Sequence, residues 1–275
     1  MIIDAHTHIY PEKIAARAIA KLESNSGVGA KTNGIKSGLI ESMKAAGVSY
    51  SLLLPVATSV KQVDTINEEA AYTNAESGQT GLLSFGGIHP DTDNYKEVLR
   101  HVKSLGLKGV KLHPDYQGAF FNDIRYKRIV SEATEQGLYL MIHAGVDIGL
   151  PEPIHCHPDH VVEVVKETQS DHLILAHMGG WRLWDEVRAK LLELPVYFDT
   201  SFSEDYLAAD GVEGMLSKEA FVDLVRAMGT DRVFFGTDSP WSDQKKAVQW
   251  IEDTALTPEE KEQIFSGNFL RVIGV

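Results

Sequence analysis

Two histidines, His6 and His8, are separated by a single residue and follow closely after the apolar start Met1–Ile3. Residues two apart in a β-strand point to the same side, so both imidazoles would project together from a strand end. Two buried polar rings side by side are costly unless something binds them, and histidine is the commonest metal ligand. The spacing therefore predicts a metal site, although a lone His-x-His pair is weakly specific.

Other apolar runs also end in residues that can bind a metal, carry a proton or bind a substrate: His89, Lys111, His113, His143, His177 and Asp238. Imidazoles with one carboxylate suit a divalent transition metal such as zinc, and a catalytic site keeps one position open for water. Such an ion lowers the pKa of its water to about 7 and so supplies hydroxide at neutral pH. Asp238 would then either bind the metal or take a proton from the water.

The elements that must position these residues alternate along the chain. Eight β-rich runs read as strands: Ile2–His6, Val48–Leu54, Gly81–Ile88, Leu107–His113, Leu138–His143, His172–His177, Val196–Thr200 and Arg232–Asp238. Helical patterns fall between them, at Lys36–Ala46, Tyr95–Leu105, Asn122–Gln136, Pro158–Gln169, Trp184–Leu194, Lys218–Met228 and Asp243–Ile251, whereas Ser24–Gly34 reads as a loop. This alternation predicts an α/β protein with parallel strands, and eight repeats favour a single (β/α)₈ TIM barrel over residues 1–275. The carboxyl ends of barrel strands share one rim, where we expect the polar residues to meet.

Composition limits the function further. The chain has 275 residues, 43% hydrophobic and 24% charged, and a formal net charge of −13, which disfavours nucleic acid and anionic membranes as partners. Cys156 is the only cysteine, so no intrachain disulfide is possible and a reducing compartment is favoured. No signal peptide and no apolar run of bilayer length are visible. We expect a soluble, cytoplasmic protein that acts on a small molecule.

Six stretches carry a family resemblance: Asp4–His8, Lys108–Pro114, Ile142–Gly145, Leu175–Gly180, Phe235–Pro240 and Gly267–Arg271. In this order they resemble the amidohydrolase superfamily, and within it the amidohydrolase-related group (amidohydrolase 2) of metal-dependent hydrolases and non-oxidative decarboxylases. The resemblance spans the whole chain and names no substrate. It implies a TIM barrel with a divalent metal ion, most simply one Zn²⁺ per chain, with two ions as the alternative.

The resemblance also implies roles for single residues. His6, His8, His143 and Asp238 would bind the metal, with Asp238 also catalytic. His177 would bind a second metal in a hydrolase, or act as a catalytic or substrate-polarising residue in a decarboxylase.

Lys111 stands where some relatives carry a carboxylated lysine that bridges two metals. Its alternatives are a lysine that binds a substrate carboxylate or one that pairs with Asp115.

Residues of the predicted rim loops are candidates for substrate binding, because such loops usually carry specificity: His89, His113, His155, Trp181 and Arg182. Trp181 and Arg182 would form a pocket wall and an anion clamp, or simply start a surface helix. Tyr197 and Phe198 are assigned to packing.

Several functions remain open at this point. A metal-dependent hydrolase that attacks a C–N, C–O or lactone bond is favoured, and a metal-dependent non-oxidative decarboxylase is the alternative.

Phosphoesterases of the PHP class share the opening motif but place a histidine after the late aspartate, where this chain has Ser239-Pro240. TatD-like nucleases place a glutamate where this chain has Lys111. A non-catalytic barrel would have lost a rim ligand, and none is missing. A homodimer is expected from the family alone.

Overall fold

The computed structural model describes residues 1–275. Contacts group the chain into two compact units. We call Met1–Leu53, Ile148–Leu150 and Asp199–Val275 the terminal unit, and Leu54–Asp147 and Pro151–Phe198 the central unit. The expectation of a single domain over residues 1–275 stays a prediction.

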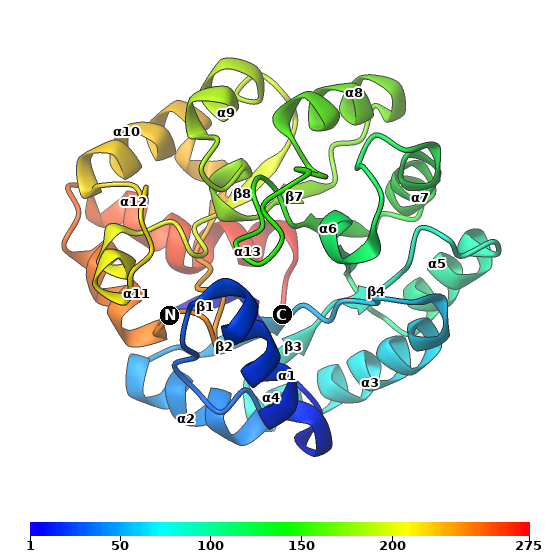
Figure 1. The fold of residues 1–275 in the computed structure, drawn as a ribbon, viewed down its shortest axis with the longest axis horizontal. Coiled ribbons are helices and arrows are strands. Elements are labelled where there is room, and N and C mark those ends of the chain that lie inside the picture. The colour runs from blue at the N-terminus through cyan, green and yellow to red at the C-terminus, as the bar shows by residue number, and fades with distance from the viewer. The chain divides into compact units, whose positions relative to one another are not determined.

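Strands and helices alternate in both units (Figure 1). The terminal unit contains β1 (Ile3–Thr7), α1 (Glu12–Ser26), α2 (Lys36–Ala46), β2 (Tyr50–Leu53), η3 (Asp205–Asp210), α10 (Lys218–Met228), η4 (Thr230–Arg232), β9 (Val233–Phe234), α11 (Gln244–Glu252), α12 (Pro258–Glu262), η5 (Gln263–Gly267) and α13 (Asn268–Val272). The central unit contains η1 (Val60–Gln62), α3 (Val63–Ala75), α4 (Ser77–Thr80), β3 (Leu82–Ser84), β4 (Gly86–Gly87), α5 (Tyr95–Ser104), β5 (Gly109–Leu112), α6 (Pro114–Gln117), α7 (Ile124–Glu135), β6 (Tyr139–Ile142), α8 (Pro158–Thr168), β7 (Leu173–Leu175), η2 (His177–Gly179) and α9 (Trp184–Lys190). The boundary falls within β8 (Tyr197–Asp199).

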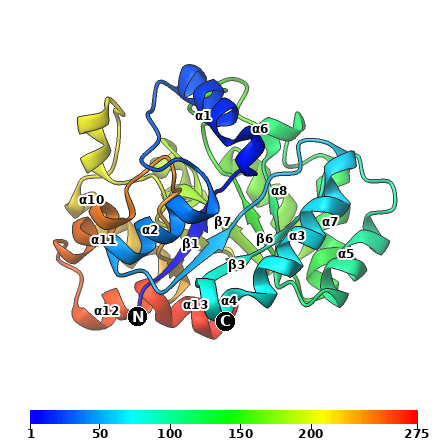
Figure 2. The same ribbon diagram turned by 90° about the horizontal axis from the view of Figure 1, so that it is seen from below.

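Parallel pairing organises the terminal unit around β1. β1 pairs with β2, with Ile3 opposite Tyr50, and Ala5 N donates to Phe235 O at 2.7 Å on its other side. Every residue of β1 is buried, as expected of a parallel strand enclosed on both faces. Figure 2 shows α1 beyond the carboxyl end of β1, with α12 and α13 at the opposite end.

The central unit is a parallel sheet covered by helices. Strands β4 to β8 pair in chain order, and β5 and β6 share four paired positions, from Gly109 opposite Tyr139 to Leu112 opposite Ile142. Helices α5, α7, α8 and α9 follow one another along the outside of these strands, each in contact with the next (Figure 1). These crossovers bring the carboxyl ends of neighbouring strands to one edge, as parallel βαβ units require.

All eight predicted strands are found, with Gly81–Ile88 divided into β3 and β4. The predicted helix Lys36–Ala46 has the predicted bounds, and Gly47 ends it at φ 72° in the left-handed region that glycine favours. Two of the longer helices, α1 and α3, were not predicted, and α1 extends to Ser26, into the predicted loop Ser24–Gly34. Their apolar stripes are faint: α1 buries only Ala15 and Ile19, and α3 places the polar Asn67 among its buried residues.

No helix of the structure combines the length and the apolar character needed to span a bilayer.

Candidate metal centre

Three ligand atoms converge in the terminal unit. Nε2 of His6 lies 3.2 Å from Nε2 of His8 and 3.5 Å from Oδ1 of Asp238, and Nε2 of His8 lies 3.1 Å from the same oxygen. Ligand atoms held tetrahedrally about 2.1 Å from an ion would lie about 3.4 Å apart. The three side chains therefore fit a divalent metal ion, and the expectation that the two histidines project together is confirmed.

Local backbone structure explains this convergence. His6 lies within β1 and is 1% exposed, whereas His8 and Asp238 are 16% and 15% exposed. Asp238 adopts φ 66°, a left-handed conformation that is costly for a residue with a side chain and is concentrated at functional sites. Its amide donates to His6 O at 2.8 Å, which ties the turn after β9 to β1.

Asp4 strengthens this connection from inside the core. Its carboxylate accepts hydrogen bonds from the Thr237 amide at 3.0 Å, from the Thr237 hydroxyl at 2.5 Å and from Nε2 of Gln244 at 2.8 Å. Burial raises the pKa of Asp4 from 3.8 to about 7, against the opposing effect of these hydrogen bonds. The aspartate of the opening motif thus holds the residue before Asp238 in place.

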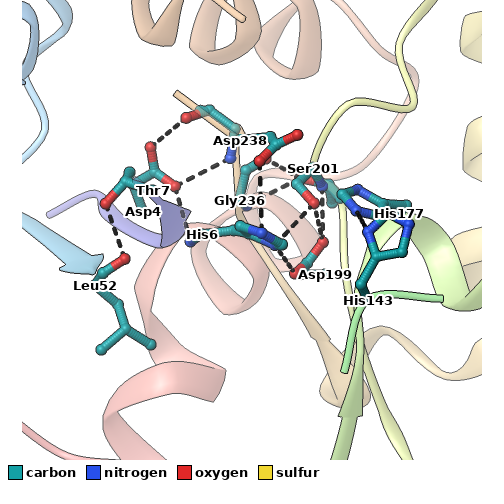
Figure 3. Close-up of polar contacts among 12 residues, drawn as sticks. Asp4, His6, Thr7, Leu52, His143, His177, Asp199, Ser201, Gly236 and Asp238 are labelled. Atoms are coloured by element: carbon teal, nitrogen blue, oxygen red, sulfur yellow. Dashed lines mark hydrogen bonds and ion pairs between the residues drawn. The ribbon is translucent and has the colours of Figure 1, made fainter. Parts of the chain in front are cut away.

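Asp199 is a residue that the sequence analysis missed. Its Oδ2 lies 2.7 Å from Nδ1 of His6, and it is fully buried (Figure 3). Its position was the available signal, because Asp199 is the second-to-last residue of the predicted strand Val196–Thr200, close to the strand end as His143 and Asp238 are. The two residues before it, Tyr197 and Phe198, were assigned to packing, and the carboxylate was passed over.

His143 and His177 meet in the central unit. Nε2 of His177 lies 3.0 Å from Nδ1 of His143, and His177 has φ 58°, again a left-handed backbone (Figure 3). Gly145 follows β6 where only a glycine fits, since a Cβ there would lie 2.1 Å from Trp181 N. This close approach fixes the loop that follows His143. Metal binding by His143 and His177 stays a prediction.

A second group of imidazoles and carboxylates surrounds His143. Nε2 of His113 and Nε2 of His143 lie 3.5 and 3.8 Å from Oδ2 of Asp147. The His113 and His143 rings stack with centroids 4.0 Å apart and planes at 6°. Imidazole lone pairs lie in the ring plane, so stacked rings cannot both aim at an ion between them. Nδ1 of His113 also accepts the Tyr116 amide, which leaves its hydrogen on Nε2. The group does not fit a second metal.

Asp115 and His155 form a pair beside this group. Nδ1 of His155 lies 3.0 Å from Oδ1 of Asp115, whose Oδ2 is buried without a hydrogen-bond partner. Burial raises the pKa of Asp115, against its hydrogen bonds to His155. His155 is the partner of Asp115 that the structure shows, and pairing of Lys111 with Asp115 stays a prediction. Lys111 is fully buried on β5, and a bridging or substrate-binding role for it stays a prediction.

The remaining predicted substrate residues lie in loops of the central unit. Trp181 is 2% exposed and the exposed Arg182 guanidinium lies 4.3 Å from its ring centroid, a cation–π contact. His89 is 7% exposed, accepts the Asp91 amide, and has a pKa lowered mainly by burial. Contact of these residues, and of His113 and His155, with a substrate stays a prediction.

Comparison with known proteins assigns the chain to a protein family. A family model described as amidohydrolase matches residues 3–275. The chain belongs to this amidohydrolase family. The predicted membership is confirmed, and the chain is an enzyme of the amidohydrolase superfamily.

Solved structures confirm the predicted fold class, a TIM barrel. An uncharacterised TIM-barrel protein from Bordetella bronchiseptica matches at a TM-score of 0.76 and 18% identity, over 98% of this chain and 97% of that one. A dihydroxybenzoic acid decarboxylase from Polaromonas sp. JS666, solved with manganese and the inhibitor 2-nitroresorcinol, matches at a TM-score of 0.71 and 15% identity, over 99% and 96%.

A curated relative is the gamma-resorcylate decarboxylase of Polaromonas sp. (strain JS666 / ATCC BAA-500), 28% identical over 105 residues. The match covers 35% of this chain and spans about a third, 32%, of that enzyme's length. From the sequence alone, a hydrolase is the favoured prediction. That preference is corrected, because the amidohydrolase-type proteins of stated activity that this chain resembles are decarboxylases.

Proposed function

We propose that the protein is a metal-dependent non-oxidative decarboxylase of a hydroxylated aromatic carboxylic acid. The observation that carries the proposal is the triangle of His6, His8 and Asp238, whose ligand atoms lie 3.1 to 3.5 Å apart. The resemblance to decarboxylases of dihydroxybenzoic acids supports the reaction type and the substrate class.

His6, His8 and Asp238 would hold one divalent ion. When bound, the ion supplies positive charge that binds the substrate's oxygens and stabilises negative charge developing on the substrate. Manganese is the first ion to test, because the dihydroxybenzoic acid decarboxylase was solved with it. The earlier expectation of zinc has no specific support.

The reaction breaks the bond between the ring carbon and the carboxylate, releases CO₂, and leaves an electron pair on that carbon for a proton. The chain must therefore deliver one proton to the ring carbon. Asp238 and His177 are the candidate carriers, since carboxylates and imidazoles are both groups that act as general acids and bases.

Product analysis tests the proposal directly. Manganese-loaded protein is incubated with 2,6-dihydroxybenzoate in D₂O, and CO₂ and the aromatic product are quantified. We expect one CO₂ per substrate consumed and one deuterium on the carbon that carried the carboxylate. Substrate loss without CO₂ would contradict decarboxylation. Should 2,6-dihydroxybenzoate be inert, other hydroxybenzoates are assayed in the same way, and inertness of the whole class would overturn the assignment.

A further inference from the structure

The His6 ring is held from both sides in the terminal unit. Its Nδ1 lies 2.7 Å from Oδ2 of Asp199 and 3.1 Å from the hydroxyl of Ser201. Its Nε2 faces His8 and Asp238, the other two residues of the candidate metal centre. Figure 3 shows the ring between Asp238 and the pair formed by Asp199 and Ser201.

The hydrogen-bond partners of Asp199 define its chemical state. Its other oxygen, Oδ1, accepts the Ser201 amide at 3.0 Å and the Ser201 hydroxyl at 2.5 Å. An ionised carboxylate only accepts hydrogen bonds, so the hydrogen between Asp199 and His6 belongs to Nδ1 of the imidazole. A neutral imidazole with hydrogen on Nδ1 leaves its lone pair on Nε2, the form that can bind a metal there.

Glycine at position 236 provides the space for this contact. A Cβ at Gly236 would lie 2.9 Å from Cβ of His6 and 3.4 Å from Cβ of Asp199. The Thr200 hydroxyl donates to Gly236 O at 3.0 Å and accepts the Gly236 amide at 3.1 Å. The segment after β8 is thus fastened to the segment after β9 where Asp199 reaches His6.

We propose that Asp199 is a positioning residue that fixes the His6 ring with Nε2 unprotonated and thereby sets the affinity of the metal centre. Ser201 orients the Asp199 carboxylate, and Gly236 leaves room for it. The inference rests on the metal centre of the proposed function and is independent of the substrate. Carboxylates that hold a metal-binding histidine typically change metal affinity about 10- to 100-fold when replaced.

Metal affinity of the protein is the first readout. Protein stripped with chelator is titrated with Mn²⁺, and free Mn²⁺ is followed by its EPR signal. We expect the Kd of Asp199→Ala to rise about 10- to 100-fold, that of Asp199→Asn to rise less because its amide oxygen still accepts from Nδ1, and that of Ser201→Ala to rise a few-fold. Glu204→Gln, a buried carboxyl on the same segment, is the matched control and should keep the wild-type Kd.

The tautomer of His6 is the second readout, and it needs no variant that might fail to fold. In metal-free wild-type protein labelled with ¹⁵N-histidine, the His6 signals should show hydrogen on Nδ1 and a lone pair on Nε2. Asp199→Ala should shift them toward a mixture of the two tautomers. A wild-type His6 with hydrogen on Nε2, or Asp199 variants with the wild-type Kd, would overturn the inference. Wild-type protein that binds no Mn²⁺ would instead contradict the metal centre itself.

Discussion

Oδ1 of Asp238 lies 3.1 Å from Nε2 of His8, although 230 positions separate these residues in the numbering. The contact joins the carboxyl end of β1 to the turn after β9, and the hydrogen bond from the Asp238 amide to His6 O stabilises it. The residues placed to hold an ion therefore come from the first and the last strand of the chain. Their spacing depends on backbone structure as well as on side chains.

Asp238→Asn removes the negative charge from this contact while keeping the shape of the side chain. Since a carboxamide is a poorer metal ligand and cannot carry a proton as a carboxylate does, we expect kcat to fall at least about 100-fold. Circular dichroism should show an unchanged fold. Decarboxylation by the variant at the wild-type rate would contradict both roles of Asp238.

Asp4→Ala leaves four buried donors without this acceptor: the His6 amide, the Thr237 amide, the Thr237 hydroxyl and Nε2 of Gln244. We expect the free energy of unfolding to fall by about 3 kcal/mol, because unsatisfied buried donors are costly. The Mn²⁺ affinity should also fall, since Thr237 precedes Asp238. Urea unfolding and Mn²⁺ titration measure the two effects, and a variant with wild-type stability would show that Asp4 does not anchor this turn.

Gly145→Ala should be more harmful than Gly118→Ala, although both glycines have positive φ. At Gly118 a Cβ meets nothing within 4 Å, so only the backbone strain remains, about 1 kcal/mol. At Gly145 the Cβ would meet the Trp181 backbone at 2.1 Å, and the loop after His143 must shift. We expect Gly145→Ala alone to impair catalysis, with kcat and KM as the measurements. Equal effects of the two substitutions would contradict a role for this close packing.

The buried Glu204 should make the free energy of unfolding depend on pH. Burial raises the pKa of Glu204 from 4.5 to about 8, with a smaller contribution from the nearby Asp199 and Asp4 carboxylates, and Oε1 of Glu204 has no hydrogen-bond partner. Between these values the folded protein keeps a proton that the unfolded chain has released. The free energy of unfolding should therefore fall as pH rises, by up to about 1.4 kcal/mol per pH unit from this group.

Glu204→Gln keeps the position neutral at every pH and should remove this decline. Urea unfolding at pH 5 and pH 8 measures it: the variant should gain stability over wild type on going from pH 5 to pH 8. If variant and wild type differ in free energy of unfolding by the same amount at pH 5 and at pH 8, Glu204 is ionised in the folded state.

The sequence predicted the parts of the fold that depend on repeated local patterns. Buried parallel strands are continuous apolar runs, so all eight were found, and the helix Lys36–Ala46 was predicted with its bounds. Helices α1 and α3 were missed because few of their residues are buried, which leaves little periodicity to detect. His6, His8 and Asp238 were predicted to lie together because each stands at the carboxyl end of a strand, and these ends of parallel strands meet at one edge.

Contacts between side chains far apart in the sequence could not be predicted in the same way. The pairing of Asp199 with His6 depends on the space left by Gly236, which no local pattern reveals. The contact of His155 with Asp115 likewise depends on where a loop folds back. The preference for hydrolysis rested on no residue that distinguishes the two reactions, since both use the same metal ligands.

Metal stoichiometry is the measurement that tests the central claim most directly. Protein purified without chelator or nickel affinity resin is analysed by elemental analysis, beside a His6→Ala/His8→Ala double variant of confirmed fold. The account predicts about one divalent ion per chain in the wild type and none in the variant, with loss and recovery of decarboxylation on stripping and on adding Mn²⁺. Wild-type protein that holds no ion, and takes up neither manganese nor zinc, would contradict it.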